Sequence, residues 1–514
     1  MNSRITAMLV GIGGIIAAFW VGSAVAKGEW IHILLFGLIA IGVVFVSGGY
    51  KYSFHILVAC VLMDGVFRIG FAISGTEQFL VIAGILVAAT AWRKREQIRL
   101  SPELRHWSFT CSKITLGIWL IYVFLHMTIH FTSFENEGLS NIVKSYNSTF
   151  TPYLFLLYFF ARPEMFPIPK SYTKAFTLIL FACLVIAIAM RVYQTYFGQI
   201  LQSMDPGEFG MAGPLFVPFL LFQENVYGLR AISPMATLMA TAILTSNYSG
   251  FRSHAWKICA LALLGTGLFG AVFSAGRAAV AISVTYLIIV LFSRRKIGQI
   301  AMGFVFSIVV LVFANLFSDW VNTRAPMQVA RSLQWILLEN DIKSSEGIED
   351  SSRWRKELAR KALAEWNLDS KNRLIGAGFR GITASDMAVV NFAGARGLTG
   401  VDEDFGHHMS IKRVATHNMF TDLLVGYGAI GAVLYYMLLF SLMSLSFHIY
   451  TMLPSSSIHK DFSMLVVAGV WVSSILGNVG GSFLPTVVVM YLIILICAVT
   501  QLPTQEYEKS SAIG

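Results

Sequence analysis

Long runs of hydrophobic residues, separated by short polar stretches, fill most of the chain. A transmembrane helix needs about 20 predominantly apolar residues, and about fourteen runs reach or approach that length. They centre on residues 5–26, 30–47, 54–73, 77–92, 113–132, 150–161, 174–197, 214–246, 256–274, 278–292, 298–318, 417–447, 462–479 and 484–500. The eighth run contains prolines and two charged residues, which predicts a broken or re-entrant element. The pattern as a whole predicts an all-α polytopic membrane protein with about 12–14 transmembrane helices.

One long polar segment interrupts this pattern. It divides the chain into an N-terminal transmembrane bundle (1–318), a large, partly helical loop (319–416), and C-terminal transmembrane helices with a short tail (417–514). Apolar positions recur at helical spacing in 328–339 and 353–366. We therefore expect amphipathic helices in the loop that lie on the membrane or on neighbouring helices.

Composition agrees with a membrane protein and argues against nucleic-acid binding, disulfide bonds and a metal site. Hydrophobic residues make up 56% of the 514 residues and charged residues only 13%, which few water-soluble domains show. The net charge is +10, but the basic residues are scattered between apolar runs, so nucleic-acid binding is not expected. The five cysteines lie in or beside apolar runs, and the adjacent His407 and His408 would seldom converge on one ion. We expect no disulfide framework and no metal.

The distribution of Lys and Arg predicts an orientation, because short cytoplasmic loops are enriched in these residues. The two richest loops, 93–105 and 294–296, fall on the same side when the spans are counted, and Lys460 falls on that side too. We therefore expect both termini in the cytoplasm. The segment 319–416 and Arg277 then face the opposite side.

His417 and Asn418 stand where the long loop re-enters the membrane, in the sequence HNMFTDLLVGYGAIG. On one continuous helix, the eleven steps from His417 to Gly428 return to nearly the same face, and Gly431 falls close beside it. The two glycines would let a neighbouring helix approach closely and would aim the imidazole. A lone histidine in such a place is more often structural, but the spacing to Gly428 and Gly431 favours a functional histidine. Helix capping accounts for Asn418 equally well.

Two isolated arginines on the same predicted side are candidates for an anion site. Arg277, in FSAGRAAV, lies between two apolar runs with only small neighbours. A fixed charge is costly there unless it has an anionic partner or reaches water, although a snorkelling interface arginine is the more ordinary interpretation. Arg353 opens an amphipathic helix, where a cation opposes the helix dipole and an external anion would rationalise it.

Together these segments resemble the O-antigen ligase and O-antigen polymerase superfamily of bacterial envelope glycosyltransferases. The resemblance covers about residues 230–450. It is carried by the His417-Asn418 pair with nine residues before Gly428-x-x-Gly431, by the small-residue-plus-arginine helix start at Arg277, and by SSRWRKELARKAL followed by LIGAGF. Family members often carry a carboxylate two residues before the first glycine, where this chain has Gly426.

The resemblance implies a metal-independent, inverting glycan transfer at the periplasmic face of the bacterial inner membrane, without a cofactor. The donor would be an undecaprenyl-diphosphate-linked glycan held among membrane lipid, and the acceptor a hydroxyl of lipid A core or of a lipid-linked glycan. Arg277 and Arg353 would stabilise the departing diphosphate, Asn418 would contribute to substrate binding, and His417 would accept the proton of the hydroxyl.

Two other functions stay open at this point. A lipid-linked oligosaccharide flippase or transporter would also use many spans, internal charges and a broken element. A non-catalytic component of a polysaccharide assembly complex is the third interpretation. Within the enzyme class, ligase and polymerase differ chiefly in the acceptor.

Overall fold

The computed structural model of the chain is α-helical, with one two-stranded hairpin, over the residues that it describes. These residues are 54–55, 58, 62, 107–131, 150, 152–161, 163, 168–169, 171–202, 215–217, 220–222, 226–274, 277–323, 337, 359–360, 363–364, 366–367, 370–376, 419–480 and 486–500. The elements are α5 (Trp107–Phe131), α7 (Tyr172–Gln202), β1 (Leu215–Val217), β2 (Leu220–Phe222), α8 (Val226–Leu244), the 3₁₀ helix η4 (Ser249–Phe251), α9 (His254–Phe273), α10 (Arg277–Ser293), α11 (Ile297–Leu316), α12 (Ser318–Thr323), α15 (Ser370–Ile375), α18 (Met419–Met452), α19 (Ile458–Gly480) and α20 (Thr486–Thr500).

The described helices are those of a polytopic membrane protein. Among the described residues, five apolar stretches are long enough to cross a bilayer: Trp107–Ile129, Tyr172–Ala189, His254–Phe273, Met419–Met452 and Ile458–Ile475. Shorter apolar helices cover Pro152–Ala161, Ile232–Leu244, Ala278–Ser293 and Val488–Thr500. The first four predicted runs lie outside the described residues, apart from positions 54–55, 58 and 62. The expected total of about 12–14 spans therefore stays a prediction.

The eighth predicted run is divided, as its prolines indicated. Strands β1 and β2 pair antiparallel, with Leu215 opposite Phe222. Helix α8 follows and contains Pro234. This part of the chain is thus a small hairpin and one helix rather than a single long span.

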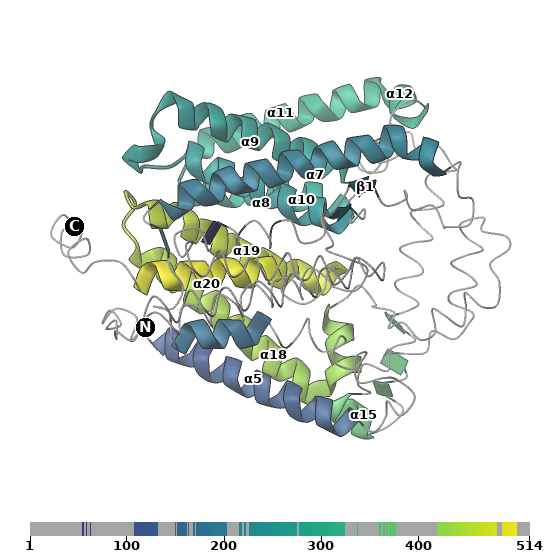
Figure 1. Cartoon of the computed structure of the whole chain (residues 1–514), viewed down its shortest axis with the longest axis vertical. Helices are drawn as coiled ribbons and strands as arrows, with labels where there is room; N and C mark the ends of the chain where they lie inside the picture. Colours follow the sequence, from purple (N-terminus) through teal and green to yellow (C-terminus); the bar gives the residue numbers. More distant parts are fainter. Residues whose placement is uncertain are drawn as a thin grey trace, which may run out of the picture.

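The helices form two groups joined by α19. Helices α7, α8, α9 and α10 pack against one another, α5 packs against α18, and α19 contacts α7, α8, α10, α18 and α20 (Figure 1). Aromatic side chains fill the contact between α5 and α18, where the Trp119 ring lies 5.2 Å from that of Tyr427 and 5.0 Å from that of Tyr435. These rings have almost no exposed surface. Burial of large aromatics at this contact fixes how the two helices pack.

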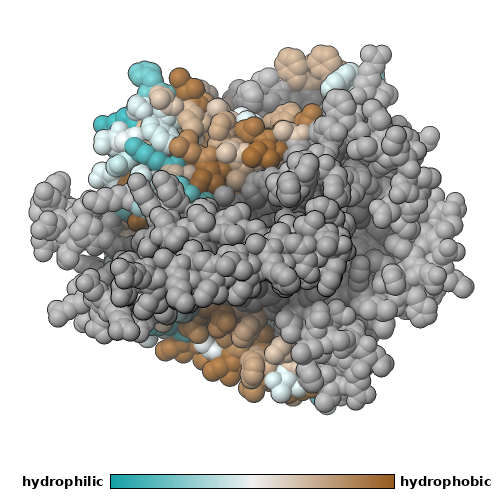
Figure 2. All heavy atoms as spheres, viewed as in Figure 1, coloured by the Kyte–Doolittle hydropathy of each residue, from teal (hydrophilic) through white to brown (hydrophobic). Residues whose placement is uncertain are grey.

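The outer surface is apolar over the flanks of the bundle. Large hydrophobic side chains point outward from α9 and α5, including Ile258, Leu261 and Ile121, which are 67%, 57% and 63% exposed. Figure 2 shows hydrophobic side chains over the flanks, with hydrophilic ones gathered at one end of the upper group of helices. An apolar belt of this kind suits contact with lipid acyl chains.

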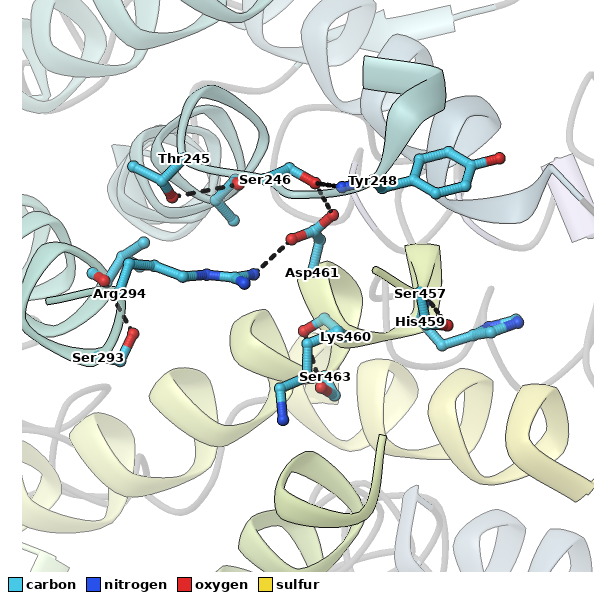
Figure 3. Close-up of polar contacts among 12 residues, drawn as sticks. Thr245, Ser246, Tyr248, Ser293, Arg294, Ser457, His459, Lys460, Asp461 and Ser463 are labelled. Carbon is cyan, nitrogen blue, oxygen red and sulfur yellow. Dashed lines mark hydrogen bonds and ion pairs between the residues drawn. The ribbon is translucent and has the colours of Figure 1, made fainter. Parts of the chain in front are cut away.

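Four helix ends meet around the buried carboxylate of Asp461, in the first turn of α19 (Figure 3). Ser246, just after α8, donates to one carboxylate oxygen at 2.5 Å, and Arg294, just after α10, donates to the other at 2.5 Å. Lys460 donates to the carbonyl of Tyr450, near the end of α18, and its ammonium lies over the Tyr450 ring. We call this the Asp461 end of the bundle. Since α8, α10 and α18 all end here, all three begin at the opposite end, which we call the loop end.

The Asp461 end agrees with one part of the predicted orientation. Arg294 was expected on the same side of the membrane as Lys460. The Arg294–Asp461 ion pair brings the end of α10 to the residue next to Lys460. Which side of the membrane this is stays a prediction.

Candidate functional site

Helix α18 is broken at Gly428, inside the predicted motif. The backbone there has φ 70° and ψ −178°, so Met419–Met452 is two helical segments joined at a kink. A residue with a Cβ atom rarely adopts this conformation, which explains why this position is a glycine. The prediction that His417, Gly428 and Gly431 align on one continuous helix is therefore wrong, because Gly431 lies beyond the break.

The end of the polar loop packs directly on this break. Helix α15 ends at Ile375, and Gly376 follows with φ 80°, its N–H donating to the carbonyl of Asn372. This left-handed glycine is a common way to end a helix. A Cβ on Gly376 would lie 2.5 Å from the carbonyl oxygen of Gly426, and a Cβ on Gly428 would overlap the Leu374 carbonyl. The two segments therefore touch backbone to backbone, at a distance that only glycine permits.

Helix α5 supplies side chains to both partners of this contact. The Tyr122 hydroxyl donates to the Tyr427 carbonyl at 2.5 Å. One turn further along α5, His126 Nε2 lies 2.8 Å from the carbonyl oxygen of Ile375. The His126 ring also lies 4.9 Å from the Tyr427 ring and is almost fully buried. Sequence analysis singled out neither side chain, since nothing local to α5 marks them.

The predicted glycines are placed differently from one another. Gly428 accommodates the Leu374–Gly376 segment of the loop rather than a neighbouring helix. Gly431 faces α5, and a Cβ on it would lie 2.8 Å from Cε1 of Tyr122. Gly426, where the resembling family often has a carboxylate, contributes its backbone carbonyl to the contact with Gly376.

The structure describes only part of the polar and charged residues that the sequence predicted for the site. His417, Asn418 and Arg353 lie outside the described residues, as does the side chain of Arg277. The backbone of Arg277 begins α10, as its position in the sequence predicted, and it therefore lies at the loop end. Met419, the first residue of α18, lies there too.

A second arginine sits beside the start of α10. Arg230, in the first turns of α8, donates through Nε to the carbonyl of Ser274 at 3.2 Å. Ser274 caps α9 and lies three residues before Arg277 in the sequence. The loop end of the α8–α10 group thus carries two guanidinium-bearing residues on adjoining elements.

The loop helix that the sequence predicted is present where the chain is described. Positions 359–360, 363–364 and 366–367 are helical. Leu363 and Trp366 pack against the core of the bundle, and Trp366 Nε1 donates to the carbonyl of Arg373 at 3.2 Å. The amphipathic segment thus folds back on the helices and leads into α15.

The arrangement offers a fixed junction between the end of the polar loop and the break in α18. Among the residues that the structure describes, no group of three or more His, Cys, Asp or Glu could hold a metal ion. The described polar groups at the loop end include the Arg230 guanidinium, the His126 imidazole, the Tyr122 hydroxyl and the Asp422 carboxylate. Of these, a guanidinium suits the binding of an anion. Comparison of the chain with models of known protein families and with curated protein sequences found no match.

Proposed function

We propose that the protein transfers a glycan from undecaprenyl diphosphate to an acceptor hydroxyl at the periplasmic face of the inner membrane, in the manner of the O-antigen ligases and polymerases. The observation that carries the proposal is the contact between Gly376 and Gly428. These residues belong to two separate motifs of the resemblance, LIGAGF and HNMFTDLLVGYGAIG, which are far apart in the sequence. Their contact means that the loop motif and the helix motif form one local structure.

The sequence positions of the charged candidates relative to this contact support the proposal. His417 lies two residues before the start of α18, and Arg353 lies in the loop segment that leads to α15. The start of α10, where the backbone of Arg277 lies, is at the same end of the bundle as the start of α18. A lipid-linked diphosphate enters such a region from the side of the bilayer, with its charge at the membrane boundary. Guanidinium groups are the side chains best suited to hold it there.

The proposed reaction is a single displacement. The acceptor oxygen attacks the anomeric carbon while the bond from that carbon to the diphosphate oxygen breaks, so the anomeric configuration inverts. The hydroxyl proton passes to the imidazole of His417, and the electron pair of the broken bond stays on the diphosphate. Arg277 and Arg353 stabilise the charge that develops there. This scheme uses no covalent enzyme intermediate and no metal.

A lipid-linked oligosaccharide transporter is the second candidate function. The break in α18 favours it, because transporters often bind their substrates at interrupted helices. A transporter would move the glycan across the membrane without changing any covalent bond.

Analysis of the surface glycans of a deletion strain separates these functions. Loss of a ligase leaves bare lipid A core and accumulated lipid-linked polymer. Loss of a polymerase leaves cores capped with single repeats. Loss of a transporter leaves the lipid-linked repeat on the cytoplasmic side, and normal surface glycan would refute all three functions.

A further inference from the structure

Helix α5 joins the two sides of the glycine contact through two side chains one turn apart. Tyr122 reaches the α18 side and His126 reaches the loop side. Residues four apart lie on the same face of a helix, so both side chains leave α5 in the same direction. Their partners are 305 and 249 residues away in the sequence.

The Tyr122 hydroxyl occupies the break itself. In a continuous helix the Gly431 N–H would donate to the Tyr427 carbonyl, four residues before it. Here the Tyr122 hydroxyl donates to that carbonyl, and the Tyr122 ring lies against Gly431. A side chain that bonds a main-chain carbonyl of a helix in this way is a recognised cause of a kink.

His126 holds the loop side of the contact. A carbonyl oxygen can only accept, so Nε2 of His126 carries the proton and donates it to Ile375. The imidazole is 1% exposed and packs against the Tyr427 ring, so water does not compete for this hydrogen bond. The carbonyl that it binds belongs to the last residue of α15, directly before Gly376.

We propose that Tyr122 and His126 are positioning residues, which hold the turn at Gly376 against the break at Gly428 and so fix the polar loop relative to the start of α18. This docking of the loop turn at Gly376 on α18 follows from the contacts alone. Its effect on turnover rests on the proposed glycan transfer, in which Arg353 of the loop and His417 before α18 must face one substrate. Displacing one relative to the other misaligns the departing diphosphate and the proton acceptor.

Hydrogen exchange of the full-length protein in lipid nanodiscs measures the docking without reference to activity. We expect His126→Phe to speed exchange in residues 370–376 by about fivefold to tenfold, because the bond to Ile375 is lost. His126→Gln keeps a side-chain N–H donor and should restore most of the protection. Tyr122→Phe removes the bond to the Tyr427 carbonyl and should speed exchange in the residues around the break at Gly428. The control Tyr153→Phe removes a buried hydroxyl that bonds Tyr435 at 2.8 Å, away from the loop, and should leave residues 370–376 unchanged.

Initial rates of transfer from a purified undecaprenyl-diphosphate-linked glycan then test the positioning role. We expect His126→Phe to lower kcat by about 10–100-fold with little change in the KM for the donor, and His126→Gln to recover it. Unchanged exchange in His126→Phe would overturn the docking. Faster exchange with an unchanged kcat would overturn the positioning role. A wild-type protein that transfers nothing, with the exchange differences as expected, would refute the proposed function and support the docking.

Discussion

Replacement of Gly428 by alanine tests the backbone contact on which the site is built. The native conformation at this position, φ 70° and ψ −178°, is one that L residues rarely adopt and costs them about 1–3 kcal/mol. The new Cβ would also overlap the Leu374 carbonyl, which is backbone and cannot rotate away. If the loop segment shifts, the His126–Ile375 hydrogen bond is lost as well, at about 1 kcal/mol. We therefore expect Gly428→Ala to destabilise the protein by about 2–4 kcal/mol.

Unfolding of the purified protein in a mild detergent measures this effect, with hydrogen exchange of residues 370–376 as the local probe. Gly265→Ala is the matched control. Gly265 is an exposed helical residue in α9 with no atom near the position of its Cβ, so alanine should stabilise the protein by up to about 1 kcal/mol. Equal stability of Gly428→Ala and the wild type, with unchanged exchange in 370–376, would refute the close contact.

The other predictions concern the two ends of the bundle. Asp461→Leu should destabilise the protein by about 3–5 kcal/mol, since it leaves the buried guanidinium of Arg294 unpaired. The double variant Asp461→Leu/Arg294→Met should recover most of that loss, and denaturant unfolding measures the stability of both variants. A reporter active only outside the cytoplasm should be active when inserted in 319–416 and silent at the C-terminus, and the reverse result would move the proposed site to the cytoplasmic face. Arg277→Lys and Arg353→Lys keep the positive charge but lose the planar guanidinium, which can donate two hydrogen bonds to one anion. Each variant should therefore insert normally and transfer glycan at least about tenfold more slowly. Wild-type rates in both variants would exclude diphosphate binding by these residues.

The helices of this fold could be predicted because each apolar run carries its own signal. The run predicted at 256–274 is α9, His254–Phe273, and the run predicted at 278–292 is α10, Arg277–Ser293. Burial and lipid exposure both require apolar side chains over the length of a span, so local hydropathy suffices. The division of the eighth run was also predicted locally, from its prolines: Pro218 lies between β1 and β2, whereas Pro234 lies within α8.

The site could be predicted only in part, because its geometry depends on distant residues. Apolar residues continue on both sides of Gly428, so the sequence there resembles an unbroken helix. Tyr122, whose hydroxyl bonds the Tyr427 carbonyl beside the break, is 305 residues away from it in the sequence. The ion pair between Arg294 and Asp461 likewise joins residues 167 apart, and nothing in either local sequence marks the pairing.

Transfer of glycan by the purified full-length protein tests the central claim most directly. The donor is an undecaprenyl-diphosphate-linked glycan, the acceptors are lipid A core and the lipid-linked repeat, and a chelator is present throughout. We predict that the wild-type protein releases undecaprenyl diphosphate and extends one acceptor, and that a folded His417→Ala variant is about 10²–10⁴-fold slower. Absence of transfer to either acceptor, or near-normal turnover by a well-folded His417→Ala variant, would contradict the account.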